Sequence, residues 1–232
     1  MSADRATAPT GVVTFLFTDV EGSTRRWESD ADGMRVALAA HDKVLRGAIE
    51  GHGGWLFKHT GDGVCAAFAS PKAAVDAAVA AQQALGLPVR MGLATGEAEL
   101  REGDYFGAVL NRAARVMAAG HGGQILLADS TASLLSGVDL IDLGPRRLRD
   151  LPTSVQVFQV QAEGLRTDFP ALRALDAGPG NLRPRAHELH WTRVRTRRGA
   201  SGGQGASVGD VDRGGWGRQD PAGVGGRGAA RR

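Results

Sequence analysis

The sequence predicts an α+β domain in which an antiparallel sheet carries helices on one face. Three observations predict this class: an apolar run of strand length near the N-terminus, two segments with apolar residues at helical spacing, and an Asp-Gly turn between two short apolar runs. With 232 residues, the chain is long enough to bury one sizeable core. Because Cys65 is the only cysteine, neither a disulfide framework nor a cysteine metal site is expected.

The first elements follow one another in a regular order. Residues 12–17, VVTFLF, form the continuous apolar run of a strand buried on both faces. Apolar residues then recur at helical spacing over residues 26–50, and Ser23 or Thr24 is the expected N-cap. Residues 53–69 contain two short apolar runs around TGDG, so they are expected to form a hairpin.

The next segments complete a compact unit. Residues 70–85 start with Ser70 and a proline at the first helical position, which predicts a capped helix, and residues 87–98 predict another strand. The order strand, helix, strand, strand, helix, strand is that of a ferredoxin-like βαββαβ unit. The pattern adds a helix at 107–119, a strand at 124–127, a helix at 129–136 and a C-terminal hairpin near 138–143 and 155–160.

Composition divides the chain into four parts: a flexible N-terminus (1–10), the folded domain (11–162), a linker (163–182) and a basic, Gly/Arg-rich tail (183–232). The tail holds 11 of the 28 basic residues but only 4 of the 25 acidic ones. With hardly any apolar periodicity, it is expected to be disordered. Such a tail is typical of nucleic-acid binding, but charge alone supports only weak, salt-sensitive association, so a specific nucleic-acid partner is not expected.

Two acidic residues are expected to converge. Asp19 ends the first strand, and Asp62 lies at the tip of the hairpin whose second strand neighbours the first in such a unit. Either residue alone is better explained as a turn acid. Facing each other, two carboxylates are costly unless a cation neutralises them, which favours a hard divalent metal.

A small polar loop follows Asp19, just before a predicted helix N-terminus. Backbone amides at such a position favour an anion. Metals beside an amide cradle indicate a polyphosphate ligand. The expected phosphate loop consists of Glu21, Gly22, Ser23 and Thr24.

Three separate motifs carry a family resemblance. FTDVEGST (17–24), KHTGDG (58–63) and GDYFGAVLNRAAR (103–115) resemble the signatures of class III adenylate/guanylate cyclase catalytic domains, over about residues 11–162. The resemblance implies an adenylyl cyclase that converts ATP to 3′,5′-cyclic AMP and pyrophosphate with two divalent cations, Mg²⁺ or Mn²⁺.

The resemblance also implies residue roles. These are metal ligation by Asp19, Asp62 and the backbone carbonyl of Val20, adenine reading by Lys58 and Asp104, and transition-state contacts by Asn111 and Arg115. A lysine can donate to adenine N1, an aspartate can accept from the adenine amino group, and an arginine fork can bind α-phosphate oxygens. Taken singly, Arg115 could be a solvated surface residue and Lys58 an edge-strand charge.

The resemblance further implies partners. The metal aspartates of one subunit would work with the adenine and transition-state residues of another, so a homodimer is expected to complete the sites. No apolar run reaches the roughly 18 residues of a membrane span, and the first residues lack signal-peptide features, so a cytoplasmic protein without a membrane partner is expected.

The C-terminal part raises a separate hypothesis. Residues 171–182 resemble the linker that joins such domains to an ATPase module in large transcriptional regulators. Read one base later, the codons of residues 187–193 permit TSFIGR, and those of 211–223 permit LTGVGGVGKTRL, which contains a phosphate loop. The chain after about Leu182 would then be an out-of-frame remnant of an ATPase region.

Two alternatives remain open at this point. One is a weakly active or silent cyclase-like module that binds nucleotide or regulates a partner. The other is a nucleic-acid-binding protein whose active region is the basic tail.

Overall fold

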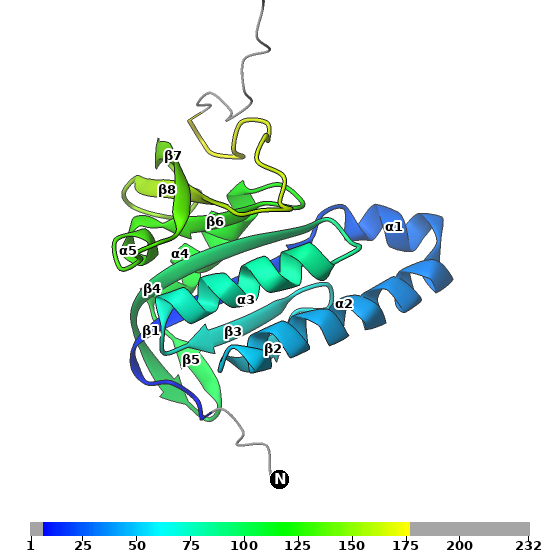
Figure 1. Ribbon diagram of the computed structural model, residues 1–232, viewed down its shortest axis with the longest axis horizontal. Coiled ribbons are helices and arrows are strands. Elements are labelled where there is room, and N and C mark those ends of the chain that lie inside the picture. The colour runs from blue at the N-terminus through cyan, green and yellow to red at the C-terminus, as the bar shows by residue number, and fades with distance from the viewer. Residues whose placement is uncertain (1–6, 177–232) are drawn as a thin grey trace, which may run out of the picture. The chain divides into compact units, whose positions relative to one another are not determined.

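The computed structural model describes residues 7–176, which form one sheet with helices on it (Figure 1). The strands run in the order β2-β3-β1-β4-β6-β8-β7, and the short strand β5 pairs with β4 alone. Their bounds are β1 Gly11–Val20, β2 Trp55–His59, β3 Val64–Phe68, β4 Val89–Arg101, β5 Asp104–Phe106, β6 Ile125–Ala128, β7 Asp139–Arg146 and β8 Val155–Gln161. The helices are α1 Ser23–Ser29, α2 Ala31–Gly51, α3 Pro71–Ala84, α4 Ala108–Ala119 and α5 Asp129–Ala132.

The predicted α+β class and the βαββαβ unit are confirmed. Strands β2, β3, β1 and β4 pair antiparallel in the order that this unit requires. The C-terminal hairpin is also present, as β7 and β8. The sheet is not antiparallel throughout, because β4 and β6 run parallel. This follows from the connection between them, since α4 crosses over and returns the chain in the same direction.

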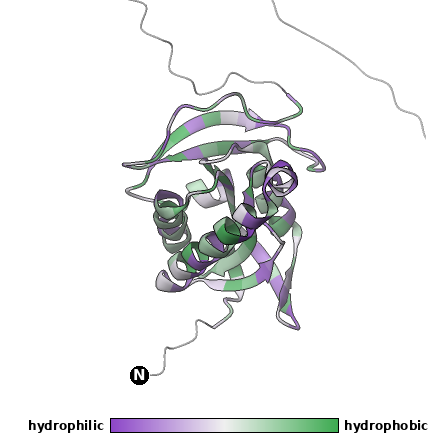
Figure 2. Cartoon of the chain, turned by 90° about the vertical axis from the view of Figure 1, so that its right-hand side faces the viewer, coloured by the Kyte–Doolittle hydropathy of each residue, from purple (hydrophilic) through white to green (hydrophobic). Residues whose placement is uncertain are grey.

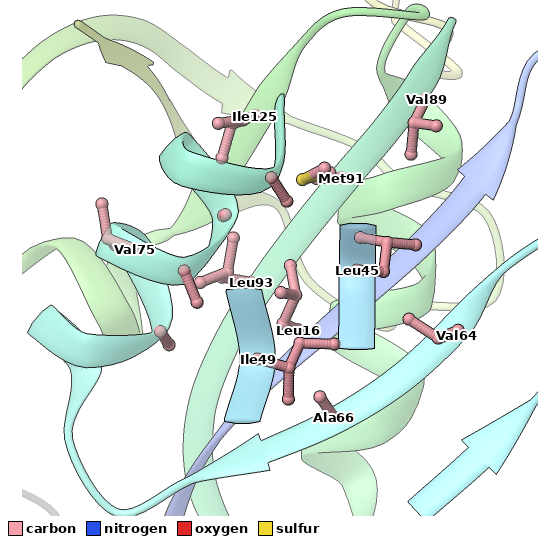
Figure 3. Packing of buried hydrophobic residues seen from close by; sticks show 14 of the residues in the cluster. Leu16, Leu45, Ile49, Val64, Ala66, Val75, Val89, Met91, Leu93 and Ile125 are labelled. Carbon is pink, nitrogen blue, oxygen red and sulfur yellow. The ribbon is translucent and has the colours of Figure 1, made fainter. Parts of the chain in front are cut away.

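One face of the sheet is covered by α2 and α3. Alternate residues of β1, starting with Leu16, point to this face and meet Leu45 and Ile49, which lie one helical turn apart on α2 (Figure 3). Val75 of α3 and Leu93 of β4 join the same cluster. In Figure 2 the helices carry hydrophobic and hydrophilic residues side by side, as helices that cover a sheet do.

The opposite face is covered by α4. The prediction of helices on one face holds for the βαββαβ unit, whereas the appended helix packs through Val109, Ala113 and Val116 against Phe15 on the other side. Gly92 of β4 allows α4 to lie close to the sheet, because a Cβ at this position would be 2.3 Å from the backbone nitrogen of Met117 in α4. Only a glycine lets the α4 backbone rest directly on β4.

Some predicted boundaries were wrong. The helix predicted over residues 26–50 is two helices, because the side chain of Asp30 accepts a hydrogen bond from the amide of Gly33 and starts α2 afresh. Neither Ser23 nor Thr24 is an N-cap, since α1 begins after Gly22 in a left-handed conformation. Ser70, by contrast, caps α3 as predicted. The helix predicted over 129–136 ends at Ala132.

Residues 163–176, predicted as linker, pack against the domain. The side chain of Phe169 is fully buried and that of Leu172 nearly so. At the other end, Pro9 accepts a hydrogen bond from the Tyr105 hydroxyl at 2.6 Å, so part of the predicted flexible N-terminus has a fixed contact. The rest of the linker, the tail and the frame hypothesis lie outside the described residues. None of the described helices combines the length and the apolar character needed to cross a bilayer.

Candidate active site

The predicted site residues of the sheet share one face, the face that α4 covers. Side chains alternate along a strand, so Asp19 points to the same side as Phe15 and Phe17. Phe17 pairs with Cys65 across β1 and β3, and Cys65 pairs with Lys58 across β3 and β2. Since directly paired residues point to the same side, Lys58 lies on this face as well.

The hairpin tip that carries Asp62 is held against the end of β1. The amide of Val20 donates to the carbonyl of Asp62 at 3.1 Å. Gly63 fits directly beside β1, where a Cβ would be 1.9 Å from the carbonyl oxygen of Thr18. The fold therefore brings the turn that carries Asp62 against the end of β1, next to Asp19.

The two carboxylates are close enough to influence each other. Burial raises the pKa of the Asp19 carboxyl above its ordinary value, the neighbouring Arg90 guanidinium acts to lower it, and the negative charge of Asp62 raises it further. A half-buried acid with a second acid beside it is a place where a cation would be stabilised.

Arg90 contacts a residue of the candidate site, and the sequence analysis missed it. It lies directly opposite Asp19 in the β1–β4 pairing. Its Nε donates to Asp19 Oδ2 at 2.8 Å, its Nη2 lies 2.6 Å from the same oxygen, and both side chains are 22% exposed. The signal that could have found it is the strand register, since Arg90 becomes the cross-strand neighbour of Asp19 once β1 and β4 are aligned.

The oxygen donors at this position suit a hard divalent cation. Asp19, Asp62 and the carbonyl of Val20 offer only oxygen ligands, which Mg²⁺ and Mn²⁺ prefer. Among residues 7–176, no group of three or more His, Cys, Asp or Glu side chains could share an ion. A cation held here would therefore complete its shell with water or substrate oxygens, as Mg²⁺ commonly does.

Lys58 and Asp104, predicted as an adenine-reading pair, are in direct contact. Lys58 Nζ lies 2.5 Å from Asp104 Oδ2, although the residues are 46 positions apart. Their hydrogen bond lowers the pKa of Asp104 and raises that of Lys58. The amide of Tyr105 donates to the other oxygen, Asp104 Oδ1, at 2.8 Å and fixes the carboxylate. Both side chains remain partly exposed, at 52% and 37%, so a ligand can reach them.

The predicted phosphate loop is held firmly at its first residue. The amide of Glu21 donates to the carbonyl of Pro88 at 2.8 Å, and its carboxylate accepts from the amide of Gly122 at 2.7 Å and pairs with Arg173. Glu21 is therefore a support of the loop. The amides of Ser23 and Thr24 lie in the first turn of α1, where helix geometry gives them no partner within the helix.

Asn111 and Arg115 lie four positions apart on α4, as predicted. Asn111 is exposed. Arg115 Nη2 donates to Asp150 Oδ2 at 2.6 Å, and Asp150 adopts a left-handed backbone conformation with φ of 59°. Arg115 also lines a cavity of about 390 Å³ with Leu148, Arg149, Arg173 and Leu175 among its neighbours.

The candidate residues form separate groups within one chain. Among residues 7–176, no hydrogen bond or ion pair connects Asp19 or Asp62 with Lys58, Asp104 or Arg115. The chain therefore presents two kinds of partial site on one face.

Known proteins share this architecture. An adenylate cyclase of Trypanosoma brucei, solved in its monomeric state, matches with a TM-score of 0.66 and 28% identity over 77% of this chain and 99% of that one. The receptor-type adenylate cyclase GRESAG 4.3 of Trypanosoma brucei brucei is 31% identical over 221 residues, covering 71% of this chain and 18% of its own. No family model matches the chain.

A mycobacterial relative is more similar in sequence. An uncharacterized protein of Mycobacterium tuberculosis is 37% identical over 185 residues, which cover 76% of this chain and 65% of the relative. The chain thus spans somewhat less than two thirds of that relative's length. With the structural match, these findings confirm the resemblance: the described residues have the fold of a class III adenylate/guanylate cyclase catalytic domain.

Proposed function

We propose that the protein is an adenylyl cyclase that converts ATP to 3′,5′-cyclic AMP and pyrophosphate at the interface of a homodimer. The observation that carries the proposal is the placement of the charged groups. Asp19 and Lys58 point to the face that α4 covers, and Asp104 of β5 pairs with Lys58. Asp62 lies in the β2–β3 turn, against the end of β1 and near enough to raise the pKa of Asp19. The names of the trypanosomal relatives support the same activity.

The Lys58–Asp104 pair supports the choice of adenine. An ammonium can only donate and a carboxylate can only accept. Adenine offers an acceptor at N1 and a donor in its amino group, which match this pair. Guanine presents the opposite pattern, with a donor at N1 and an acceptor at O6. Lys58 and Asp104 already neutralise each other, so the base would not bury an unpaired charge when it hydrogen-bonds to both.

Arg115 and Asn111 would act on the phosphate and the ribose. The guanidinium has five donors, of which Asp150 uses one, so others can contact the α-phosphate as its charge grows. Asn111, one helical turn before Arg115, would orient the ribose. The first-turn amides of Ser23 and Thr24 would hold the outer phosphates.

Asp19, Asp62 and the carbonyl of Val20 would hold two divalent cations. When bound, Mg²⁺ or Mn²⁺ would activate the ribose 3′-hydroxyl and hold the triphosphate. Arg90 keeps the Asp19 carboxylate in place by binding one of its oxygens, Oδ2, with two nitrogens.

The dimer is supported by the separation of the groups and by the surface around them. Phe17, Trp55 and Phe57 lie half-buried on the face that carries the site, and Phe106 is 51% exposed. Aromatic residues of this kind are enriched in protein interfaces. A second subunit would cover them and bring its Arg115 towards the Asp19–Asp62 pair.

The test is to incubate the purified protein with ATP and Mn²⁺ or Mg²⁺ and to measure cyclic AMP. We expect Asp62→Ala to abolish formation, and Asp32→Ala, a matched change at an exposed acid of α2, to leave it unchanged. If the protein binds ATP with Mn²⁺ but forms no cyclic AMP, the proposal is wrong and the silent module remains.

Mixing two inactive variants tests the shared site. Asp62→Ala and Arg115→Ala would each fail alone, but their heterodimer contains one intact site. Random pairing restores about a quarter of the wild-type activity, since half of the dimers are mixed and each has one working site of two. No recovery, or a specific activity that stays constant on dilution below the dimer's dissociation constant, would rule out the shared site.

A further inference from the structure

Residues 163–176, called the strap below, run across the end of the domain where the predicted phosphate loop lies. They are joined to α4 and to the turn before β6 by the main chain, since the amide of Arg173 donates to the carbonyl of Ala119 at 2.9 Å. The carbonyl of Ala171 lies 3.0 Å from His121 Nε2. The backbone of the strap therefore contacts the C-terminal end of α4 and the turn that follows it.

Buried side chains anchor the strap. Phe169 is fully buried and stacks on the His121 ring at 6.5 Å with an interplanar angle of 9°. The guanidinium of Arg166 lies over the Phe169 ring, 4.7 Å from its centre. Leu172 enters the same core cluster as the buried face of α4. These contacts fix the position of Arg173, the residue that follows Leu172.

Arg173 reaches the loop through Glu21. Its Nη2 binds Glu21 Oε1, while the amide of Gly122 donates to the other oxygen, Oε2, at 2.7 Å. Gly122 is required for this approach, because a Cβ there would lie 2.9 Å from Glu21 Oε2 and 2.6 Å from Pro88. The Glu21 carboxylate is thus clamped between the strap and the α4–β6 turn.

The clamped residue begins the loop. The amide of Glu21 donates to Pro88, and the next residue, Gly22, makes the left-handed turn with φ of 71° into α1. Any shift of Glu21 would move Gly22 and the first-turn amides of α1. Arg173 also borders the cavity at Arg115 and a second one, of about 650 Å³, at Gly22, so it contacts both partial sites of the chain.

We infer that Arg173 is a positioning residue for the reaction: through Glu21, it holds the loop of residues 21–24 in the conformation that receives the substrate's phosphates. The inference rests on the proposed function for its catalytic consequence. The strap thereby belongs to the catalytic domain and is a functional part of the site.

The experiment compares Arg173→Ala with Arg173→Lys and with Arg35→Ala, a matched change at an exposed arginine of α2. Exchange of the Glu21 and Gly122 amide protons is followed by NMR, because these amides donate the hydrogen bonds that hold Glu21 to Pro88 and to Gly122. Loss of a partly exposed ion pair is expected to speed their exchange about threefold to fivefold in Arg173→Ala. Arg173→Lys keeps the charge and should restore most of the protection.

Kinetics then separate positioning from simple support. We expect the KM for ATP to rise about threefold or more in Arg173→Ala with a smaller change in kcat, and Arg173→Lys to lower it again. In a Glu21→Gln background, Arg173→Ala should add little, since the pair is already broken. If the wild type proves inactive, the dissociation constant of ATP with Mn²⁺ replaces KM, so the two proposals fail separately.

Each outcome decides the inference. Exchange and ATP affinity that change together, with rescue by lysine, support it. Unchanged exchange at Glu21 and Gly122 overturns it. Faster exchange with unchanged KM or affinity also overturns it, because Arg173 would then be a structural contact only.

Discussion

The burial of Phe169 predicts that the strap contributes to the stability of the whole domain. Replacing a fully buried phenylalanine by alanine removes its transfer free energy and leaves a cavity, which costs about 3–5 kcal/mol. The ring also contacts the Arg166 guanidinium, a contact that contributes about 0.5–1 kcal/mol at accessible sites. For a domain of this size, about 3–5 kcal/mol corresponds to a fall in Tm of about 6–20 °C.

The assay is urea unfolding of the full chain, followed by tryptophan fluorescence and by circular dichroism. We expect Phe169→Ala to lower the midpoint in both signals together, since Leu172 of the same strap packs in the core cluster of α4. The control is Leu175→Ala in the same segment, where the side chain is 64% exposed and the change should stay within about 0.5 kcal/mol. If Phe169→Ala changes stability as little as Leu175→Ala, residues 163–176 are a linker, and the reasoning on the strap is wrong.

Two further predictions concern the sheet and its cysteine. Gly92→Ala should destabilise the domain by at least about 1–3 kcal/mol in the same unfolding assay, because its Cβ would meet the backbone of Met117, whereas Gly86→Ala, where nothing lies within 4 Å, should not. Equal effects would contradict the close packing of the α4 backbone against β4. Burial raises the pKa of the Cys65 thiol to about 11, against about 8.5 for a free cysteine, so alkylation by iodoacetamide at pH 8.5, read by mass spectrometry, should be about a hundredfold slower in the native protein than in urea. Native labelling at the free-thiol rate would show that Cys65 is accessible.

The fold was largely predictable because its elements have strong local signals. Ser70 with the following proline marks the start of α3, and the Asp-Gly turn at Asp62 marks the β2–β3 hairpin. The break at Asp30 was missed, since apolar spacing continues through it and only the side-chain cap reveals the restart. Strand β5 was missed because three residues carry no periodicity, and the face taken by α4 depends on packing at Gly92.

The candidate site was predictable only where a motif contains its residues. Arg90, Asp150 and Arg173 lie outside the three motifs, and each was found only through the tertiary contact it makes. Arg90 could be derived from strand register. Asp150 and Arg173 could not, since their partners are set by a left-handed turn and by the docking of the strap.

The Asp19–Arg90 pair has a consequence for how the proposed metal site works. Both arginine nitrogens bind Oδ2, so within the described residues the geometry leaves Oδ1 to face another ligand. The guanidinium already offsets part of the charge that a cation would otherwise neutralise, which weakens the attraction for a bare ion. The protein offers two carboxylates, and Arg90 already binds one of them, Asp19. Cation affinity should therefore depend strongly on the substrate's own phosphate oxygens. Cation and nucleotide would then bind together, which links metal occupancy to the presence of substrate.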